Sequence, residues 1–90
     1  MKTLDVSSQG LTEFKIPEGI KILYCHNNKL TKLIVPEGIK ILRCDDNKLT
    51  ELIVPKGIEI LWCYNNNLTE LSVPEEIILH CDGTFKVTYY

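Results

Sequence analysis

The chain lacks any excess of charge of one sign. Ten Lys and Arg side chains stand against twelve Asp and Glu, which gives a formal net charge of −2 at pH 7. A protein that holds a phosphate backbone or an anionic membrane surface needs a basic field, and this composition does not supply one. We therefore expect neither nucleic acid nor a membrane surface as a partner.

Long apolar runs and a leader pattern are also missing. No aliphatic run exceeds three residues, as in Leu33-Ile34-Val35, whereas a transmembrane helix needs about 20. The segment from Met1 to Asp5 lacks the apolar region of a secretory signal. The 90 residues, 44% of them hydrophobic, are expected to form one small domain over residues 1–90, too short for a multidomain enzyme.

An internal repeat organises the sequence. The segments 23–41 and 42–60 are identical at 13 of 19 positions, far above chance. Such a period is the mark of a solenoid, in which each unit buries its apolar face against its neighbours. The predicted units are residues 4–22, 23–41, 42–60 and 61–78, followed by a partial repeat and cap over residues 79–90.

Each unit contains one short stretch that reads as a strand. Leu23 and Cys25 alternate with the variable Tyr24, the pattern of a strand with one buried face. About twelve residues remain per unit, rich in Ile, Val and Thr, and Pro36-Glu37-Gly38 suits a type I turn. We expect the return limb to be extended or 3₁₀, with little or no α-helix.

The repeated positions resemble those of a known family. The series Leu23, Cys25, Asn28, Leu30 and Leu33 is similar to the leucine-rich repeat, L-x-x-L-x-L-x-x-N/C-x-L, with Cys where Leu is more frequent. The match covers nearly the whole chain and looks like the shortest subclass, similar to repeats of bacterial effectors and to Cys- and Asn-rich repeats of giant viruses. The resemblance implies a right-handed leucine-rich-repeat solenoid with a curved parallel sheet of five strands on its concave face.

Residue types that recur in every unit are expected to serve packing. Aliphatic columns would stack through the interior, and the asparagine column would satisfy backbone groups of the adjacent coil. The predicted structural ladders are Asn28, Asn47 and Asn66, and Cys25, Cys44, Cys63 and Cys81.

The four cysteines allow other interpretations. A zinc site usually draws on two close pairs of ligands, whereas these residues stand singly at spacings of 19, 19 and 18. A disulfide fits poorly between residues that point the same way on adjacent parallel strands. A catalytic thiol would need a base on its own face, but His26 and His80 neighbour Cys25 and Cys81 and project oppositely. We therefore expect no metal and no cofactor, and four reduced, buried thiols in a reducing compartment.

Positions that vary between units are expected to carry the function. Strand alternation sends them to one surface, the concave face. Tyr, Trp and Arg are typical of interface hot spots, and the only Trp and the only Arg of the chain lie there. The predicted binding residues are Tyr24, His26, Ile41, Arg43, Asp45, Ile60, Trp62, Tyr64 and His80.

The predicted function is a non-enzymatic protein- or peptide-binding module in the cytoplasm, or in a host cytoplasm if the source is a pathogen or virus. The identity of the partner is left open. Exposed strands also favour aromatic residues and Ile for intrinsic reasons, so a purely structural role is the plain alternative. The second alternative is a self-assembling repeat protein, a homo-oligomer that pairs through an uncapped sheet edge. A metal or catalytic site could be drawn from His26 and Asp45, as neighbours across strands, or from His80 and Asp82, which project the same way along one strand, but it would lack a nucleophile and a water-excluding pocket.

Overall fold

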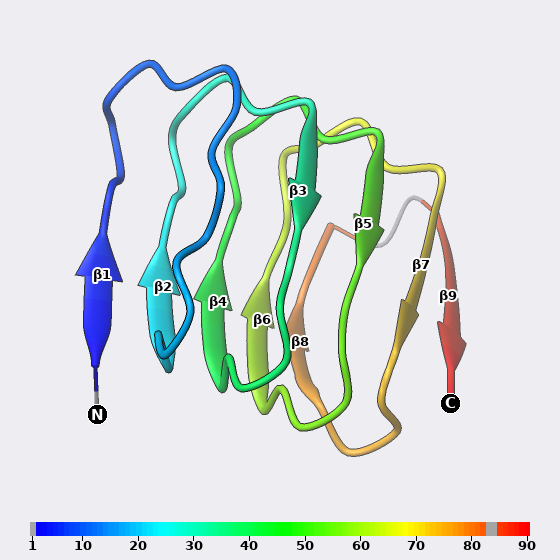
Figure 1. Ribbon diagram of the computed structural model, residues 1–90. Helices are drawn as coiled ribbons and strands as arrows, with labels where there is room; N and C mark the ends of the chain where they lie inside the picture. The colour runs from blue at the N-terminus through cyan, green and yellow to red at the C-terminus, as the bar shows by residue number, and fades with distance from the viewer. Residues whose placement is uncertain (1, 83–84) are drawn as a thin grey trace.

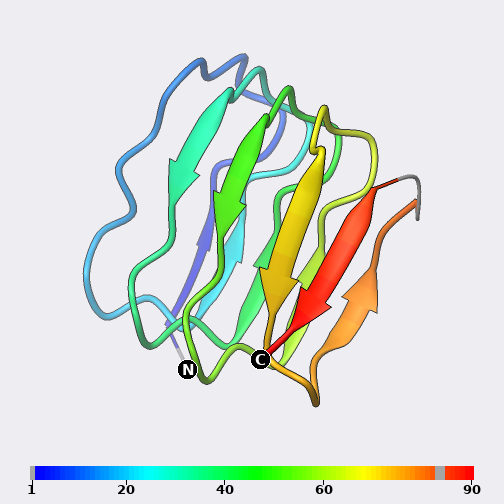
Figure 2. The ribbon, with the colours of Figure 1, turned by 90° about the vertical axis from the view of Figure 1, so that its right-hand side faces the viewer.

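The protein is a parallel β-solenoid. The computed structural model describes residues 2–82 and 85–90, and within them it contains nine short strands and no helix. The strands form two parallel sheets, which lie as two layers with opposite strand directions (Figures 1 and 2). The first sheet has the order β1-β2-β4-β6-β8, with bounds Thr3–Asp5, Ile22–Tyr24, Ile41–Arg43, Ile60–Trp62 and Ile78–His80. The second has the order β3-β5-β7-β9, with bounds Lys32–Ile34, Glu51–Ile53, Glu70–Val73 and Lys86–Tyr89.

The repeat period sets the register of the first sheet. Leu23 pairs with Leu42 and Leu42 with Leu61, which are steps of 19 residues. Leu61 pairs with Leu79, a step of 18. The predicted parallel sheet is thus confirmed, and its last step is shortened as the sequence spacing indicates.

The return limb is extended, one of the two predicted forms, and it does more than connect. Leu33 pairs with Leu52 in parallel, and Leu71 pairs with Val87. The prediction contained a single sheet, so the second one is a correction. Its physical reason is that extended limbs stacked at the spacing of the coils leave backbone N–H and C=O groups facing each other, and these pair.

The core lies between the two sheets. Central strand residues point inward, as Leu23 and Leu42 do in the first sheet and Leu33 and Leu52 do in the second. Each such side chain contributes roughly 1.5–3 kcal/mol from burial, before chain entropy is subtracted. The two inward faces form one continuous cluster.

Two kinds of corner turn the chain between the sheets. After the first sheet, one residue per coil adopts a left-handed conformation, with φ between 54° and 57°. Asn and Asp tolerate this region better than other non-glycine residues. After the second sheet, Gly38 at the end of Pro36-Glu37-Gly38 has φ +102°, which a side chain would strain. The left-handed non-glycine residues are Ser8, Asn27, Asp46 and Asn65.

The C-terminal segment completes the second sheet. In the predicted cap, residues 79–90, positions 83 and 84 lie outside the described residues, and β9 pairs along its length with β7. The Tyr90 backbone N–H donates to the Val73 carbonyl, and its hydroxyl donates to the Val54 carbonyl. The end of the chain is thereby fixed against two preceding coils.

Candidate functional site

The outer face of the first sheet carries the predicted binding residues in ordered columns. The register places Tyr24 beside Arg43, Arg43 beside Trp62, and Trp62 beside His80. Parallel strands lie about 4.8 Å apart, so neighbouring side chains in this column are within contact distance. Thr3, Ile22, Ile41, Ile60 and Ile78 form the column that precedes it on the same face.

Three members of the central column stack on one another. The Trp62 and His80 rings are nearly parallel, 10° apart in orientation with centroids 4.7 Å apart. The Arg43 guanidinium carbon lies 5.8 Å from the Trp62 ring centroid, within the range of a cation–π contact. A stack of three side chains therefore crosses β4, β6 and β8.

The isoleucine column lies beside this stack. Ile41 and Ile60 are half-buried, and Ile78 is 56% exposed. Apolar area is thus contiguous with aromatic area on this face. We keep Ile41 and Ile60 as candidate binding residues on this ground.

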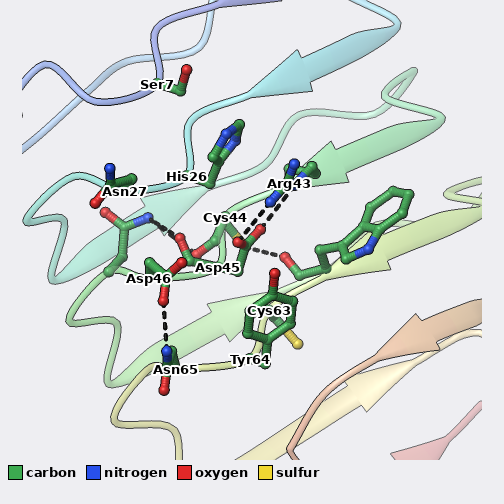
Figure 3. A network of polar contacts seen from close by, with 12 residues as sticks. Ser7, His26, Asn27, Arg43, Cys44, Asp45, Asp46, Cys63, Tyr64 and Asn65 are labelled. Atoms are coloured by element: carbon green, nitrogen blue, oxygen red, sulfur yellow. Dashed lines mark hydrogen bonds and ion pairs between the residues drawn. The ribbon is translucent and has the colours of Figure 1, made fainter.

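Asp45 lies differently from the prediction. We expected an exposed side chain on the binding face, but the structure buries Asp45 completely. Its carboxylate accepts two hydrogen bonds from the Arg43 guanidinium, Nε to Oδ1 at 3.1 Å and Nη2 to Oδ2 at 2.9 Å (Figure 3). The reason is that Arg43 folds over the neighbouring column and pairs with the carboxylate two residues on. Asp45 is therefore a support for Arg43 rather than a contact residue.

The buried carboxylate also acts on its neighbours. Asp45 accepts from Arg43 and so raises the pKa of that guanidinium above its ordinary value. The negative charge of Asp45 raises the pKa of the Tyr64 hydroxyl, since it opposes formation of a second anion. Arg43 stays cationic and Tyr64 neutral at physiological pH.

His26 lies against Tyr24 on the same face. Their rings meet edge to face, with centroids 6.3 Å apart. Within the described residues, its Nδ1 atom is buried and has no hydrogen-bond partner. Asp45 follows β4 in the adjacent coil, where the backbone of Asn27 donates to its carbonyl, but no hydrogen bond or ion pair among the described residues joins the His26 and Asp45 side chains.

At the C-terminal end of this face is a shallow hollow. Trp62, Tyr64, Leu79, His80 and Asp82 line it, together with Asn65 and Cys81. The Asp82 carboxylate accepts a hydrogen bond from the Asn65 backbone N–H at 3.0 Å. The hollow combines two aromatic rings, an imidazole and one carboxylate.

The asparagine column lies inside the coil, as its ladder role requires. Asn47 donates from Nδ2 to the carbonyls of Cys25, Cys44 and Asp45 at 3.1–3.2 Å, and its Oδ1 accepts from the Leu30 N–H at 3.0 Å. Asn28 and Asn66 make equivalent contacts one coil away on either side. One side chain thus joins two coils at each step.

The cysteine column is also internal. Cys25, Cys44 and Cys63 are buried and Cys81 is half-buried, and all four thiols are free. Burial raises the pKa of Cys25 and Cys63 to about 12, and that of Cys44 well above its ordinary value. Such thiols are poor nucleophiles and poor metal ligands. Among the residues that the structure describes, no three His, Cys, Asp or Glu side chains gather as a metal site.

Sequence reasoning missed the outer face of the second sheet. Ile34 and Ile53 are 76% and 72% exposed there, side by side on β3 and β5. The signal was present, because in both Lys32-Leu33-Ile34 and Glu51-Leu52-Ile53 one buried leucine separates two outward positions. These isoleucines had not been assigned to either surface.

Over residues 2–82 and 85–90, the fold is a helix-free parallel β-solenoid with coils of about 19 residues. No protein-family model matches the chain, and neither a curated protein nor a solved structure shows significant similarity to it. Within the part of the chain that is described, no helix is long and apolar enough to cross a membrane.

Proposed function

We propose that the chain is a non-enzymatic binding module of the leucine-rich-repeat type, and that it takes a protein or peptide partner on the outer face of its first sheet. On this proposal that face is the concave side of a right-handed solenoid. Two features support the family assignment. One is the column of leucines in each of the two sheets. The other is the asparagine ladder, which lies at the corner of each coil where the L-x-x-L-x-L-x-x-N pattern places an asparagine.

The observation that carries the binding proposal is the stack of Arg43, Trp62 and His80 beside the column of isoleucines. Trp, Tyr and Arg dominate the binding energy of protein interfaces, and contiguous apolar area adjoining them is typical of a recognition surface. Tyr24 extends the same column by one strand. The proposed contact surface is thus a strip across four strands.

The rigidity of this strip favours binding. Arg43 is held at both sides, by the Asp45 carboxylate and by the Trp62 ring. A long side chain that is already ordered loses less entropy when a partner covers it. We infer that Asp45 contributes to affinity through Arg43 and not by contact.

The role and location follow the same reasoning. The small net charge supports a protein partner over a nucleic acid or a membrane surface. Buried free thiols support a reducing compartment, and we propose the cytoplasm. The Asp45 carboxylate is already paired, which supports recognition rather than catalysis.

The experiment is capture of a partner from native lysate on three forms of the chain. The test variant is Tyr24→Thr/Trp62→Thr, and the control is Glu70→Thr/Ser72→Thr on the opposite sheet, where both side chains are exposed. Threonine keeps the strand preference at each position, and Arg43 stays intact so that the buried carboxylate remains paired. Circular dichroism and urea unfolding check that each form is folded.

The proposal expects a protein that the wild type and the control capture and the test variant loses. It fails if the folded test variant retains every captured protein, or if the control loses the same protein.

Self-assembly through a sheet edge is the second candidate function. Among the described residues β1 is the outermost strand of the first sheet and pairs only with β2. An open edge of this kind can add a strand of another copy. Head-to-tail addition does not close, so it would give assemblies that keep growing with concentration.

A further inference from the structure

The outer face of the second sheet carries the two most exposed large apolar side chains of the described residues. Ile34 is 76% and Ile53 is 72% exposed. They are direct neighbours on adjacent parallel strands, as the register of β3 and β5 pairs them. Exposed together, they form an apolar centre that the folded chain itself does not cover.

A pair of opposite charges lies directly beside this apolar centre. Lys32 on β3 is paired in register with Glu51 on β5, and both side chains are exposed on the same outer face. β3 and β5 therefore each carry one charged side chain and one isoleucine, at matching register positions. The pattern differs between the strands only in the sign of the charge.

Hollows flank β3 on both sides. One lies between β3 and β5 and is lined by Ile34, Ile53, Lys32 and Glu51, with Leu33 and Val35. The other lies between β3 and the first coil, where Phe14, Ile16, Ile34 and Pro36 line it with Glu13, Lys15, Glu18 and Lys32. Ile34 thus stands as a ridge between two grooves, a shape that can interdigitate with a similar ridge.

We propose that this face is an interface between two copies of the chain. A two-fold axis that runs along the strands, between β3 and β5, exchanges the two strands. It places Ile34 against Ile53 of the partner subunit, and Lys32 against Glu51 of the partner subunit. Each contact occurs twice, as a self-complementary interface requires.

The charge pattern selects this arrangement over the other face-to-face pairing. A two-fold axis perpendicular to the strands, placed midway between the charged and the apolar positions, would reverse the strand direction and set the charged column of one copy on the isoleucines of the other. That arrangement desolvates Lys32 and Glu51 without a partner, which is unfavourable. The axis along the strands satisfies both the charges and the apolar groups.

The size of the molecule sets the expected strength. It measures 28 × 25 × 16 Å, so even a broad face offers at most about the 800 Å² per partner of a standard interface. The contact argued here comprises only two isoleucines and two charged side chains per copy, so the dimer is expected to be weak and to depend on concentration. It closes at two copies and leaves the outer faces of both first sheets free, so each dimer presents the proposed binding strip twice.

The test is sedimentation velocity from low micromolar to near-millimolar concentration. The wild type is expected to pass from monomer to dimer and to stop there, and Ile34→Thr/Ile53→Thr is expected to remain monomeric. Lys32→Glu and Glu51→Lys alone should each weaken dimerisation by about tenfold or more, because each places like charges together at two symmetric contacts.

Mixing the two charge variants is the decisive arm. In a mixed dimer, Glu at position 32 of one copy meets Lys at position 51 of the other, and Glu51 meets Lys32, so both contacts become attractive. The mixture is expected to dimerise where neither variant does so alone. Mixing cannot relieve a repulsion between two residues of the same chain. Recovery of the dimer in the mixture therefore shows that the two positions meet between copies.

Four results would overturn the proposal. These are a wild type that stays monomeric throughout, a dimer that survives the isoleucine variant, a mixture that remains monomeric, and assemblies that grow beyond two copies. The last result would favour pairing through the edge of β1. None of these outcomes depends on whether the first sheet binds a partner.

Discussion

The Arg43 guanidinium and the Asp45 carboxylate form a two-pronged ion pair, in which one partner is fully buried and the other is partly open. The Asp45 side chain has 0% exposure and that of Arg43 has 32%. The two hydrogen bonds, at 3.1 and 2.9 Å, satisfy both carboxylate oxygens. A residue at the centre of the proposed binding strip is therefore also a structural requirement.

Arg43→Met should destabilise the fold by about 2–3 kcal/mol, because it leaves a buried carboxylate without its cation while keeping the apolar stem. The double variant Arg43→Met/Asp45→Asn should lose less than the single one, since the buried charge is gone. Urea unfolding at pH 7 measures both. Equal losses in the two variants would show that the ion pair does not carry this stability.

Asn47→Ala should cost about 2–4 kcal/mol, because the substitution leaves buried backbone groups of two coils without partners. Asn47 is buried and donates to three carbonyls. Asn67→Ala is the control, since Asn67 is an exposed asparagine in the next repeat, and it should change stability by less than about 0.5 kcal/mol. Similar costs at the two positions would contradict the ladder role.

Stability should fall as the pH rises above about 9. Cys25 and Cys63 have an ordinary pKa of 9.0 that burial raises to about 12 in the folded chain, so the folded state keeps protons that the unfolded state loses. The thiol contribution is complete below pH 9 and declines between 9 and 12, at about 1.4 kcal/mol per pH unit for each thiol.

Urea unfolding across this pH range measures the decline in the free energy of unfolding. Cys44→Ala removes one buried thiol and is expected to lower the slope of that decline by the contribution of one thiol. An unchanged slope in that variant would contradict the account.

Half-buried Cys81 should react with iodoacetamide before the three buried thiols, on grounds of access alone.

Ser8→Asn should stabilise the fold by a few tenths to about 1 kcal/mol. Ser8 has φ 56°, the left-handed conformation that Asn27, Asp46 and Asn65 adopt in the later coils, and Asn accepts it more readily than Ser. Ser72→Asn is the control, since Ser72 lies in a strand where Asn is unfavourable. Thermal unfolding compares them, and a loss of stability in Ser8→Asn would refute the argument.

The sequence predicted the first sheet well for a physical reason. A period of 19 residues with a fixed column of leucines forces successive strands into register, since any slip would expose the leucines. The second sheet was harder to predict, because each of its strands shows only one buried leucine between two outward residues, as in Lys32-Leu33-Ile34. So short a pattern does not distinguish a paired strand from an extended connection.

The face of a residue was predictable, but its pairing was not. Alternation placed Arg43 on the outer face, where it lies. Nothing in the pattern showed that its side chain would turn toward Asp45 and bury that carboxylate, because this depends on rotamers and on the Trp62 ring of the next coil. The sequence shows that Arg43 and Asp45 are opposite charges two residues apart. It does not show that their ion pair buries the Asp45 carboxylate.

The most direct test of the proposed binding surface is site-specific photo-crosslinking. A photoreactive phenylalanine analogue replaces Tyr24 on the first sheet in one form of the chain and Ser72 on the second sheet in another. Both positions lie on outward strand faces. In lysate, the account predicts a crosslink from position 24 to the same protein that the wild type captures, and none to that protein from position 72. Crosslinking of that partner from position 72 but not from position 24 would contradict it.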